Sequence, residues 1–351
     1  MRKLSGRTWL SIITFVIILL VLFFSRNELA QAWQVMQTIN IWALLAMLIP
    51  LQFVSYFAMG ETLFTYLRSI GQGKNVSPLK FARLSLEMNF VNHMLPSAGV
   101  SGASYMGWRL KHIGVSLSKS TSAQLVRVVA VAGGYAIVLA AAVLFMLFDG
   151  SLNRWISLFA VVLVAATFIL VAGMIYLLER AEKLSTLARG LVKIANTAVR
   201  LATFGRQKKK FPSVKPLADF LTDIQDDYRK IRTKKQLLVK PLIWGVVFTL
   251  AEVGMFYVTF LALGHPINPA PIAIAFGLAG VAGIFMVTPG GAGLYEVVMI
   301  SFLTVAGVNP GVGIAAIVLA RVLLMVGTIA TGYYFYQQAI IKHGKHPDAA
   351  L

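Results

Sequence analysis

The 351-residue sequence contains no cysteine, and its 13 acidic residues stand against 32 lysines and arginines. Without thiols, disulfide bonds, thiol nucleophiles and thiolate-bound metals are excluded. The five histidines show no HExxH or comparable spacing, which speaks against a metal enzyme. No nucleotide-binding motif is present. We therefore expect no metal, no cofactor and no enzymatic activity.

The sequence is rich in long hydrophobic segments. Hydrophobic residues make up 58% of the chain, charged residues 13%, and the mean hydropathy is +0.76, a composition far outside that of a soluble domain. Apolar runs long enough to cross about 30 Å of hydrocarbon predict full spans. They cover residues 9–24, 41–67, 117–148, 155–178, 241–263 and 310–336. We interpret the first as an uncleaved span, because it is longer than a typical signal-peptide core.

The positive charge is concentrated between spans. Residues 179–240 hold 16 lysines and arginines against 6 acids, which supplies +10 of the net +19. This pattern is typical of a cytoplasmic loop under the positive-inside rule and makes nucleic acid an unconvincing partner. Apolar stripes within 184–202 and 217–231 predict two amphipathic helices on the anionic inner leaflet. With this loop and both termini in the cytoplasm, 28 of the 32 basic residues lie inside.

Two further apolar tracts, 79–112 and 271–306, are broken near the middle by "LPSAGVSG" and "TPGGAGLYE". Several residues recur at a nearly constant separation of 191 to 194. The matching pairs are Glu61 with Glu252, Pro96 with Pro289, Gly114 with Gly307, and Arg127 with Arg321. This order predicts an internal repeat over residues 41–148 and 241–337, whose two copies run in opposite directions through the membrane.

The sequence thus predicts an all-α polytopic membrane protein, with residues 1–351 forming a single membrane domain. It would contain two inverted repeats, six full spans and two broken hairpins, each hairpin either re-entrant or a pair of short spans.

The broken tracts and the deep arginines indicate a binding site. Non-helical backbone at membrane depth is tolerated only where it is buried in protein or lines a watery cavity. A half-helix starting near Gly293 would direct its positive dipole end into such a cavity. Arg127 and Arg321 each lie about 15 Å into a span, where a charge costs at least about 2.5 kcal/mol and marks a pathway. Guanidinium groups suit phosphate.

The candidate residues fall into two groups. The candidates for substrate binding are Arg127, Arg321, Pro96, Gly99, Ser101, Pro289, Gly290, Gly291, Gly293, Glu296, Asn89 and Asn92. Glu61 and Glu252 are the candidates for proton coupling or for ion pairs.

Structural alternatives stand beside these roles. Glu296 can cap its half-helix or bind a proton or a lipid amine, and Arg127 and Arg321 can pair with Glu61 and Glu252. Interhelical hydrogen bonds account for Asn89 and Asn92 as well as substrate contact does. Arg83 and Glu87, four residues apart, fit an interfacial salt pair.

At both breaks and in the arginine-bearing spans after them, the sequence resembles the flippase-like transmembrane region of lysylphosphatidylglycerol synthases and the stand-alone proteins of that family. The resemblance rests on "NHMLPSAGVSG" with "LVRVVAVAGG", and on "TPGGAGLYE" with "AGVNPGVGIAAIVLARVLLMVG". It implies translocation of a lipid headgroup, with aminoacylation performed by a separate C-terminal domain. Only 15 residues follow position 336, so we expect no transferase activity. Ala103 stands where the repeat would place a counterpart of Glu296, which argues against a strictly symmetric site.

These observations favour a translocase in the inner membrane of a bacterium. Its substrate would be a phosphate-bearing lipid, either an anionic phospholipid or a polyprenyl phosphate. The main alternative is a non-transporting scaffold whose partner is a lipid-synthesising or glycosyl-transferring enzyme. A membrane-embedded lipid transferase is less favoured, because no nucleophile or pair of carboxylates is recognisable.

Overall fold

A computed structural model describes residues 33–344, except residues 35, 38, 74–75, 95–99, 151–153, 180–213 and 285–292. Within these ranges all regular secondary structure is α-helical. The protein is therefore an all-α polytopic membrane protein. The span expected at 9–24 and the amphipathic helix expected at 184–202 lie outside the described residues.

Five described helices are long and apolar enough to cross a membrane. They are α3 (Ile41–Ser69), α6 (Leu117–Asp149), α7 (Arg154–Glu179), α10 (Gln236–Ala262) and α13 (Pro310–His343). Their starts follow from local sequence. The side chains of Asn40, Ser116 and Asn309 accept hydrogen bonds from the first turns of α3, α6 and α13, as N-cap residues do. The five predicted spans that fall in the described ranges are confirmed.

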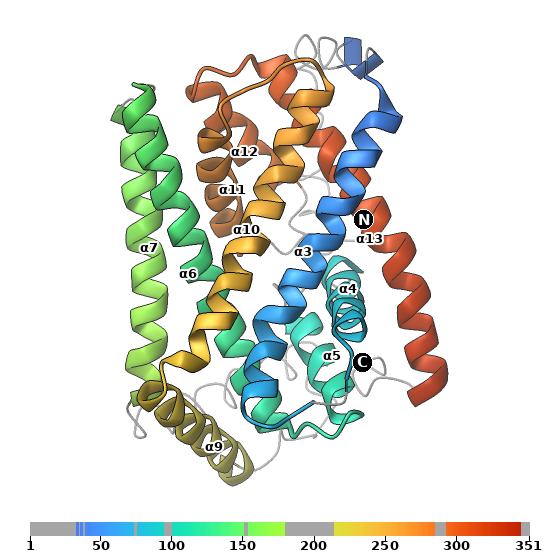
Figure 1. The fold of residues 1–351 in the computed structure, drawn as a ribbon, viewed down its shortest axis with the longest axis vertical. Helices are drawn as coiled ribbons and strands as arrows, with labels where there is room; N and C mark the ends of the chain where they lie inside the picture. The colour runs from blue at the N-terminus through green and yellow to red at the C-terminus, as the bar shows by residue number, and fades with distance from the viewer. Residues whose placement is uncertain are drawn as a thin grey trace, which may run out of the picture.

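Each broken tract forms two short helices that pack against each other. The first comprises α4 (Pro78–Met94) and α5 (Val100–Lys111), and the second α11 (Pro269–Ile284) and α12 (Leu294–Val305). Helices of 12 to 17 residues reach about 18–26 Å, which is less than the hydrocarbon thickness. Figure 1 shows α4 and α5 in one half of the molecule, and α11 and α12 in the opposite half. These lengths favour re-entrant hairpins over pairs of short spans.

Corresponding helices of the two halves run in opposite directions. In Figure 1, α3 descends where α10 ascends, and α6 ascends where α13 descends. These are the directions that an inverted repeat requires. The relation of the two halves as a repeat stays a prediction.

Small residues bring α6 and α10 into close contact. A Cβ atom built on Gly245 of α10 would lie 2.1 Å from the carbonyl oxygen of Ala130 in α6. One built on Gly134 of α6 would lie 2.3 Å from the carbonyl carbon of Gly245. Side chains larger than hydrogen are excluded here, so the two backbones touch.

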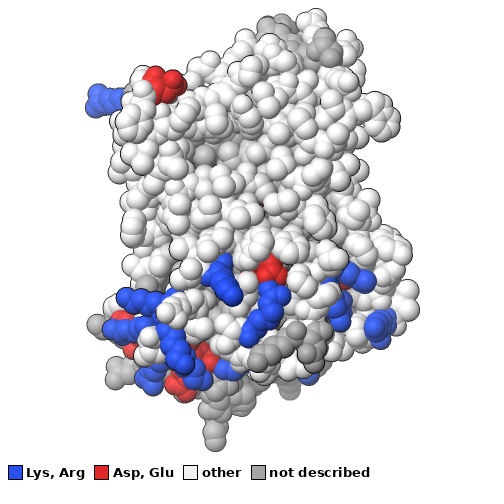
Figure 2. All heavy atoms as spheres, viewed as in Figure 1, with Lys and Arg blue, Asp and Glu red and all other residues white. Residues whose placement is uncertain are grey.

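Charged side chains gather at one end of the molecule, while its middle is almost free of them on the face in Figure 2. The helix α9 (Val214–Thr233) lies across this charged end (Figure 1). Ile224, from the predicted apolar stripe, is only 4% exposed, and Asp227 forms an ion pair with Lys119 of α6. At Ile224, therefore, the predicted stripe packs on the protein and not on the lipid leaflet; the rest of the leaflet prediction stays a prediction.

Candidate functional site

Arg127 is the arginine of α6, and its hydrogen-bond contacts within the described residues are to sulfur atoms. Its Nη1 contacts the sulfur atoms of Met88 in α4, at 3.5 Å, and Met59 in α3, at 3.7 Å. Its Nε is buried and has no hydrogen-bond partner. No carboxylate of the described residues forms an ion pair with it. A guanidinium in this position retains its capacity to bind an anion.

The predicted pairing of Arg127 with Glu61 is wrong. Glu61 forms an ion pair with Arg68 of its own helix instead. Seven residues make about two turns, which puts both side chains on the same face of α3. The nearer local partner therefore takes the carboxylate, and the second oxygen of Glu61 stays buried without a hydrogen bond.

Arg127 faces a cavity of about 510 Å³ between α6, α7, α10 and α11. It is the one charged side chain among the residues that line it. Tyr135 of α6, Thr167 of α7 and Thr249 of α10 also line the cavity, but each hydroxyl donates to a backbone carbonyl, at 3.2, 2.9 and 3.0 Å. The cavity is thus an apolar space with a single cation.

Arg321, in α13, is bound differently. Its Nε lies 2.8 Å from Oε1 of Glu296 in α12, and its guanidinium lies 4.3 Å from the centre of the Tyr295 ring. The two charged side chains are 15% and 17% exposed. Arg321 is therefore held by an internal carboxylate and an aromatic face.

Glu296 also caps the half-helix to which it belongs. Its second oxygen accepts a hydrogen bond of 2.7 Å from the backbone N–H of Gly293. Gly293 has φ of 99°, a left-handed conformation that favours glycine. The carboxylate thus occupies the position at the start of α12 where the sequence predicts a substrate anion.

Glu252 of α10 lies near this pair. It accepts a hydrogen bond of 2.5 Å from the hydroxyl of Ser55 in α3, and Arg321 acts on it electrostatically. Ser55 is one turn, or about 6 Å, from Met59, which contacts Arg127. Glu252 and Arg127 therefore both contact the turn of α3 between Ser55 and Met59.

The first half-helix pair has its own polar contact. Oδ1 of Asn92 in α4 accepts a 2.9 Å hydrogen bond from the backbone N–H of Gly102, in the first turn of α5. Asn92 therefore joins the two arms of the hairpin. Asn89 contributes its backbone carbonyl, 2.8 Å from Nδ1 of His93, and Ser101 is half-buried. The predicted site residues Pro96, Gly99, Pro289, Gly290 and Gly291 lie outside the described residues.

The structure contains two polar clusters that the sequence predicted only in part or not at all. Glu87 receives hydrogen bonds of 2.8 Å from Arg83, Arg109 and Tyr105, of which the sequence predicted only the first. Gln52 in α3 donates to the Leu324 carbonyl of α13, at 3.0 Å. The signal for this second cluster was a pair of polar residues, Gln52 and Tyr56, one turn apart in a span.

The sequence of this chain is similar to that of known proteins. Residues 9–332 match the family of the lysylphosphatidylglycerol synthase transmembrane region. A UPF0104 membrane protein of Methanothermobacter thermautotrophicus is 33% identical over 103 residues, which make up 29% of this chain and 30% of that protein. The match thus spans under a third of the relative's length. Because the family match covers most of the chain, the protein belongs to the lysylphosphatidylglycerol synthase transmembrane family.

Proposed function

We propose that the protein is a lipid translocase, which moves a phosphate-bearing headgroup between the leaflets of the inner membrane. The headgroup belongs to an anionic phospholipid or a polyprenyl phosphate. The observation that carries the proposal is Arg127, which lies beside a cavity in an apolar bundle and pairs with no carboxylate of the described residues. An unpaired charge at this depth costs at least about 2.5 kcal/mol, and phosphate is the group that a guanidinium binds with forked geometry.

The arrangement of the helices supports transport rather than static binding. The two hairpins enter from opposite ends of the bundle, and the helices around them run in opposite directions (Figure 1). Transporters with inverted halves place their site near the midplane and expose it to each side in turn. The basic end in Figure 2 is then the cytoplasmic end under the positive-inside rule.

The test is leaflet exchange of fluorescent phosphatidylglycerol in liposomes that contain the purified protein, read by quenching of the outer leaflet. Arg127→Met and Arg321→Met should each reduce exchange to the rate of protein-free vesicles. Arg127→Lys should retain part of the activity, because it keeps the charge but loses the fork. The exposed Arg154, outside the site, provides the control Arg154→Met. Full exchange by both site variants, with their thermal stability unchanged, would refute the proposal.

A scaffold for a lipid-synthesising enzyme is the second candidate, and one observation favours it. Arg229, Lys230 and Arg232 of α9 have side chains that are 66–67% exposed at the charged end of the molecule. If the protein is a scaffold, replacing these three residues by glutamine should abolish its ability to complement a strain that lacks it. The arginine variants of the site should then have no effect.

A further inference from the structure

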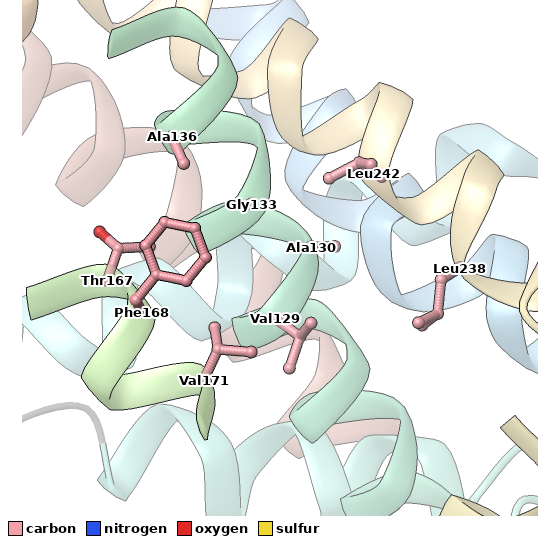
Figure 3. Close-up of a pocket in the computed structure, with 9 residues that line it drawn as sticks. All are labelled: Val129, Ala130, Gly133, Ala136, Thr167, Phe168, Val171, Leu238 and Leu242. Carbon is pink, nitrogen blue, oxygen red and sulfur yellow. The ribbon is translucent and has the colours of Figure 1, made fainter. Parts of the chain in front are cut away.

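The cavity between α6, α7 and α10 has a volume of about 270 Å³ and is lined almost entirely by apolar side chains (Figure 3). The one hydroxyl among its lining residues, that of Thr167, donates to the Leu163 carbonyl of its own helix at 2.9 Å. This cavity therefore offers no group to an ion or a proton. The titratable group that the proposed function leaves unused lies further along α10, at Glu252.

The two glutamates that the sequence assigns to proton coupling or to ion pairs differ in their partners. Glu61 forms an ion pair with Arg68. Glu252 forms no ion pair with a described residue, and its Oε1 accepts a hydrogen bond of 2.5 Å from the hydroxyl of Ser55. It lies about 24 Å from the start of α10 and about 15 Å from its end. An ionised carboxylate without a cation of its own is costly at this depth, and a group so placed takes up a proton instead.

Glu252 lies close to the ion pair of Arg321 and Glu296. Phe256, one turn further along α10, stacks on Tyr295 with ring centroids 6.5 Å apart. The guanidinium of Arg321 lies 4.3 Å from the centre of the same Tyr295 ring. One guanidinium thus serves two carboxylates, Glu296 directly at 2.8 Å and Glu252 electrostatically from further away. We call Arg321, Glu296 and Glu252 the Arg321 centre.

The helices around the Arg321 centre contribute few other titratable groups. Those of the described residues are Tyr56 of α3, His93 of α4, Arg127 and Tyr135 of α6, and Tyr295 of α12. The helix α11 carries none. Tyrosines are neutral and arginines charged throughout the neutral range. His93, on which Arg321 acts electrostatically, is therefore the neighbour whose own titration has to be separated from that of Glu252.

The net charge of the Arg321 centre depends on one proton. One guanidinium and two ionised carboxylates leave a single negative charge, whereas a proton on Glu252 makes the centre neutral. A phosphate that approaches Arg321 meets the extra negative charge only in the first case. For charges on the order of 10 Å apart at an effective dielectric constant of about 20, this repulsion weakens phosphate binding roughly tenfold.

We propose that Glu252 is a proton-binding site, and that one proton on this carboxylate accompanies each anionic headgroup across the membrane. The residue is half-buried rather than sealed, so water can supply the proton. The proton binds to Oε2, because Oε1 accepts the hydroxyl of Ser55, and it returns to water when the headgroup leaves Arg321. Proton and headgroup move in the same direction. The coupling rests on the proposed function, whereas the proton site does not.

The first test measures how a pH gradient distributes lipid. Liposomes hold a gradient of about one pH unit, acidic outside, and valinomycin with equal potassium clamps the membrane potential at zero. They contain trace phosphatidylglycerol with a fluorophore on one acyl chain, a phosphodiester that keeps one negative charge. One pH unit and a tenfold ratio are nearly the same free energy, so wild-type protein should enrich the lipid about tenfold in the inner leaflet. Glu252→Gln keeps an acceptor oxygen but binds no proton, so it should exchange the lipid and leave equal amounts in both leaflets.

Two variants control this test. Glu61→Gln removes a buried carboxylate that is already paired, and His93→Gln removes the neighbouring histidine. Both should reach the tenfold ratio. Equal amounts in both leaflets with wild-type protein, or a tenfold enrichment by Glu252→Gln, would overturn the coupling.

The second test detects the proton without transport. Purified protein is titrated from about pH 5 to about pH 9, a range in which ordinary carboxyl groups become fully ionised near its acidic end. Infrared difference spectra should show the carbonyl stretch of one carboxyl group that stays protonated beyond that end. Glu252→Gln should remove this band, Glu61→Gln should leave it, and Ser55→Ala should shift it, because the carboxyl group loses its hydrogen bond. No such band in wild-type protein, or the same band in Glu252→Gln and Ser55→Ala, would overturn the proton site.

The outcomes distinguish the inference from the proposed function. If the band behaves as expected but the lipid distributes equally with wild-type protein, the proton site stands and its coupling fails, while the translocase is unaffected. If exchange depends on Arg127 and Arg321 but the band is absent, the translocase stands and the inference fails. If wild-type protein accelerates no exchange, the proposed function fails and the band alone decides the proton site.

Discussion

Replacing Glu87 by alanine should strongly destabilise the protein, because this carboxylate holds the first hairpin together. Its side chain is 0% exposed and accepts hydrogen bonds of 2.8 Å from Arg83 of α4 and from Arg109 and Tyr105 of α5. The Arg109 side chain is only 6% exposed. Removing one partner of a buried ion pair leaves an uncompensated charge and costs about 3–5 kcal/mol.

The matched control is an acid in an exposed pair. Asp226 lies 3.5 Å from Arg229, and the two side chains are 55% and 67% exposed, so Asp226→Ala should cost at most about 1 kcal/mol. At about 2–4 °C per kcal/mol, Glu87→Ala should reduce the melting temperature by roughly 6–20 °C. Tryptophan fluorescence during heating in detergent can report this, since the Trp108 ring lies 5.5 Å from that of Tyr105. A shift no larger than that of Asp226→Ala would refute the reasoning.

Two further predictions concern packing and the charged end. Gly245→Leu should lower the melting temperature and the yield of folded protein, because its side chain would collide with the Ala130 backbone at 2.1 Å. Wild-type stability in that variant would contradict the close contact of α6 and α10. Lys119→Met should loosen α9, because Lys119 pairs with a carboxylate, Asp227, that is 2% exposed. The reporter is Gln225→Cys, whose thiol is the only one in the chain and replaces a side chain that is 4% exposed. This thiol should react with maleimide faster when Lys119→Met is added. An equal rate would show that the ion pair of Lys119 and Asp227 does not hold α9.

The sequence predicted the spans well, because hydropathy reports the length of apolar segments directly. It did not predict where the helices end. The last span was expected to end at residue 336, but α13 continues to His343, and α10 begins at Gln236 rather than at 241. Polar and charged residues at these ends are compatible with a helix but not with hydrocarbon, so hydropathy misses them.

The site was predictable only where its contacts are local in the chain. Gly293 and Glu296, three residues apart, stand at the start of a half-helix that the sequence already places there, and the cap follows from that spacing. The bond from Ser55 to Glu252 joins residues 197 apart. It depends on how α3 packs against α10, which no local pattern specifies. The wrong pairing of Glu61 has the opposite cause, since its true partner, Arg68, lies on the same helix only seven residues away.

In the second half, the carboxylate of Glu296 competes with a substrate phosphate for Arg321. A phosphate that reaches Arg321 must displace a group that is tethered beside it at high effective concentration. Under the proposed function, the phosphate therefore has a short residence time at Arg321. The predicted repeat places Ala103 at the corresponding position of the first half, and no carboxylate of the described residues pairs with Arg127. Under the proposed function, Arg127 would therefore hold a phosphate longer than Arg321, and a single acid would set this difference.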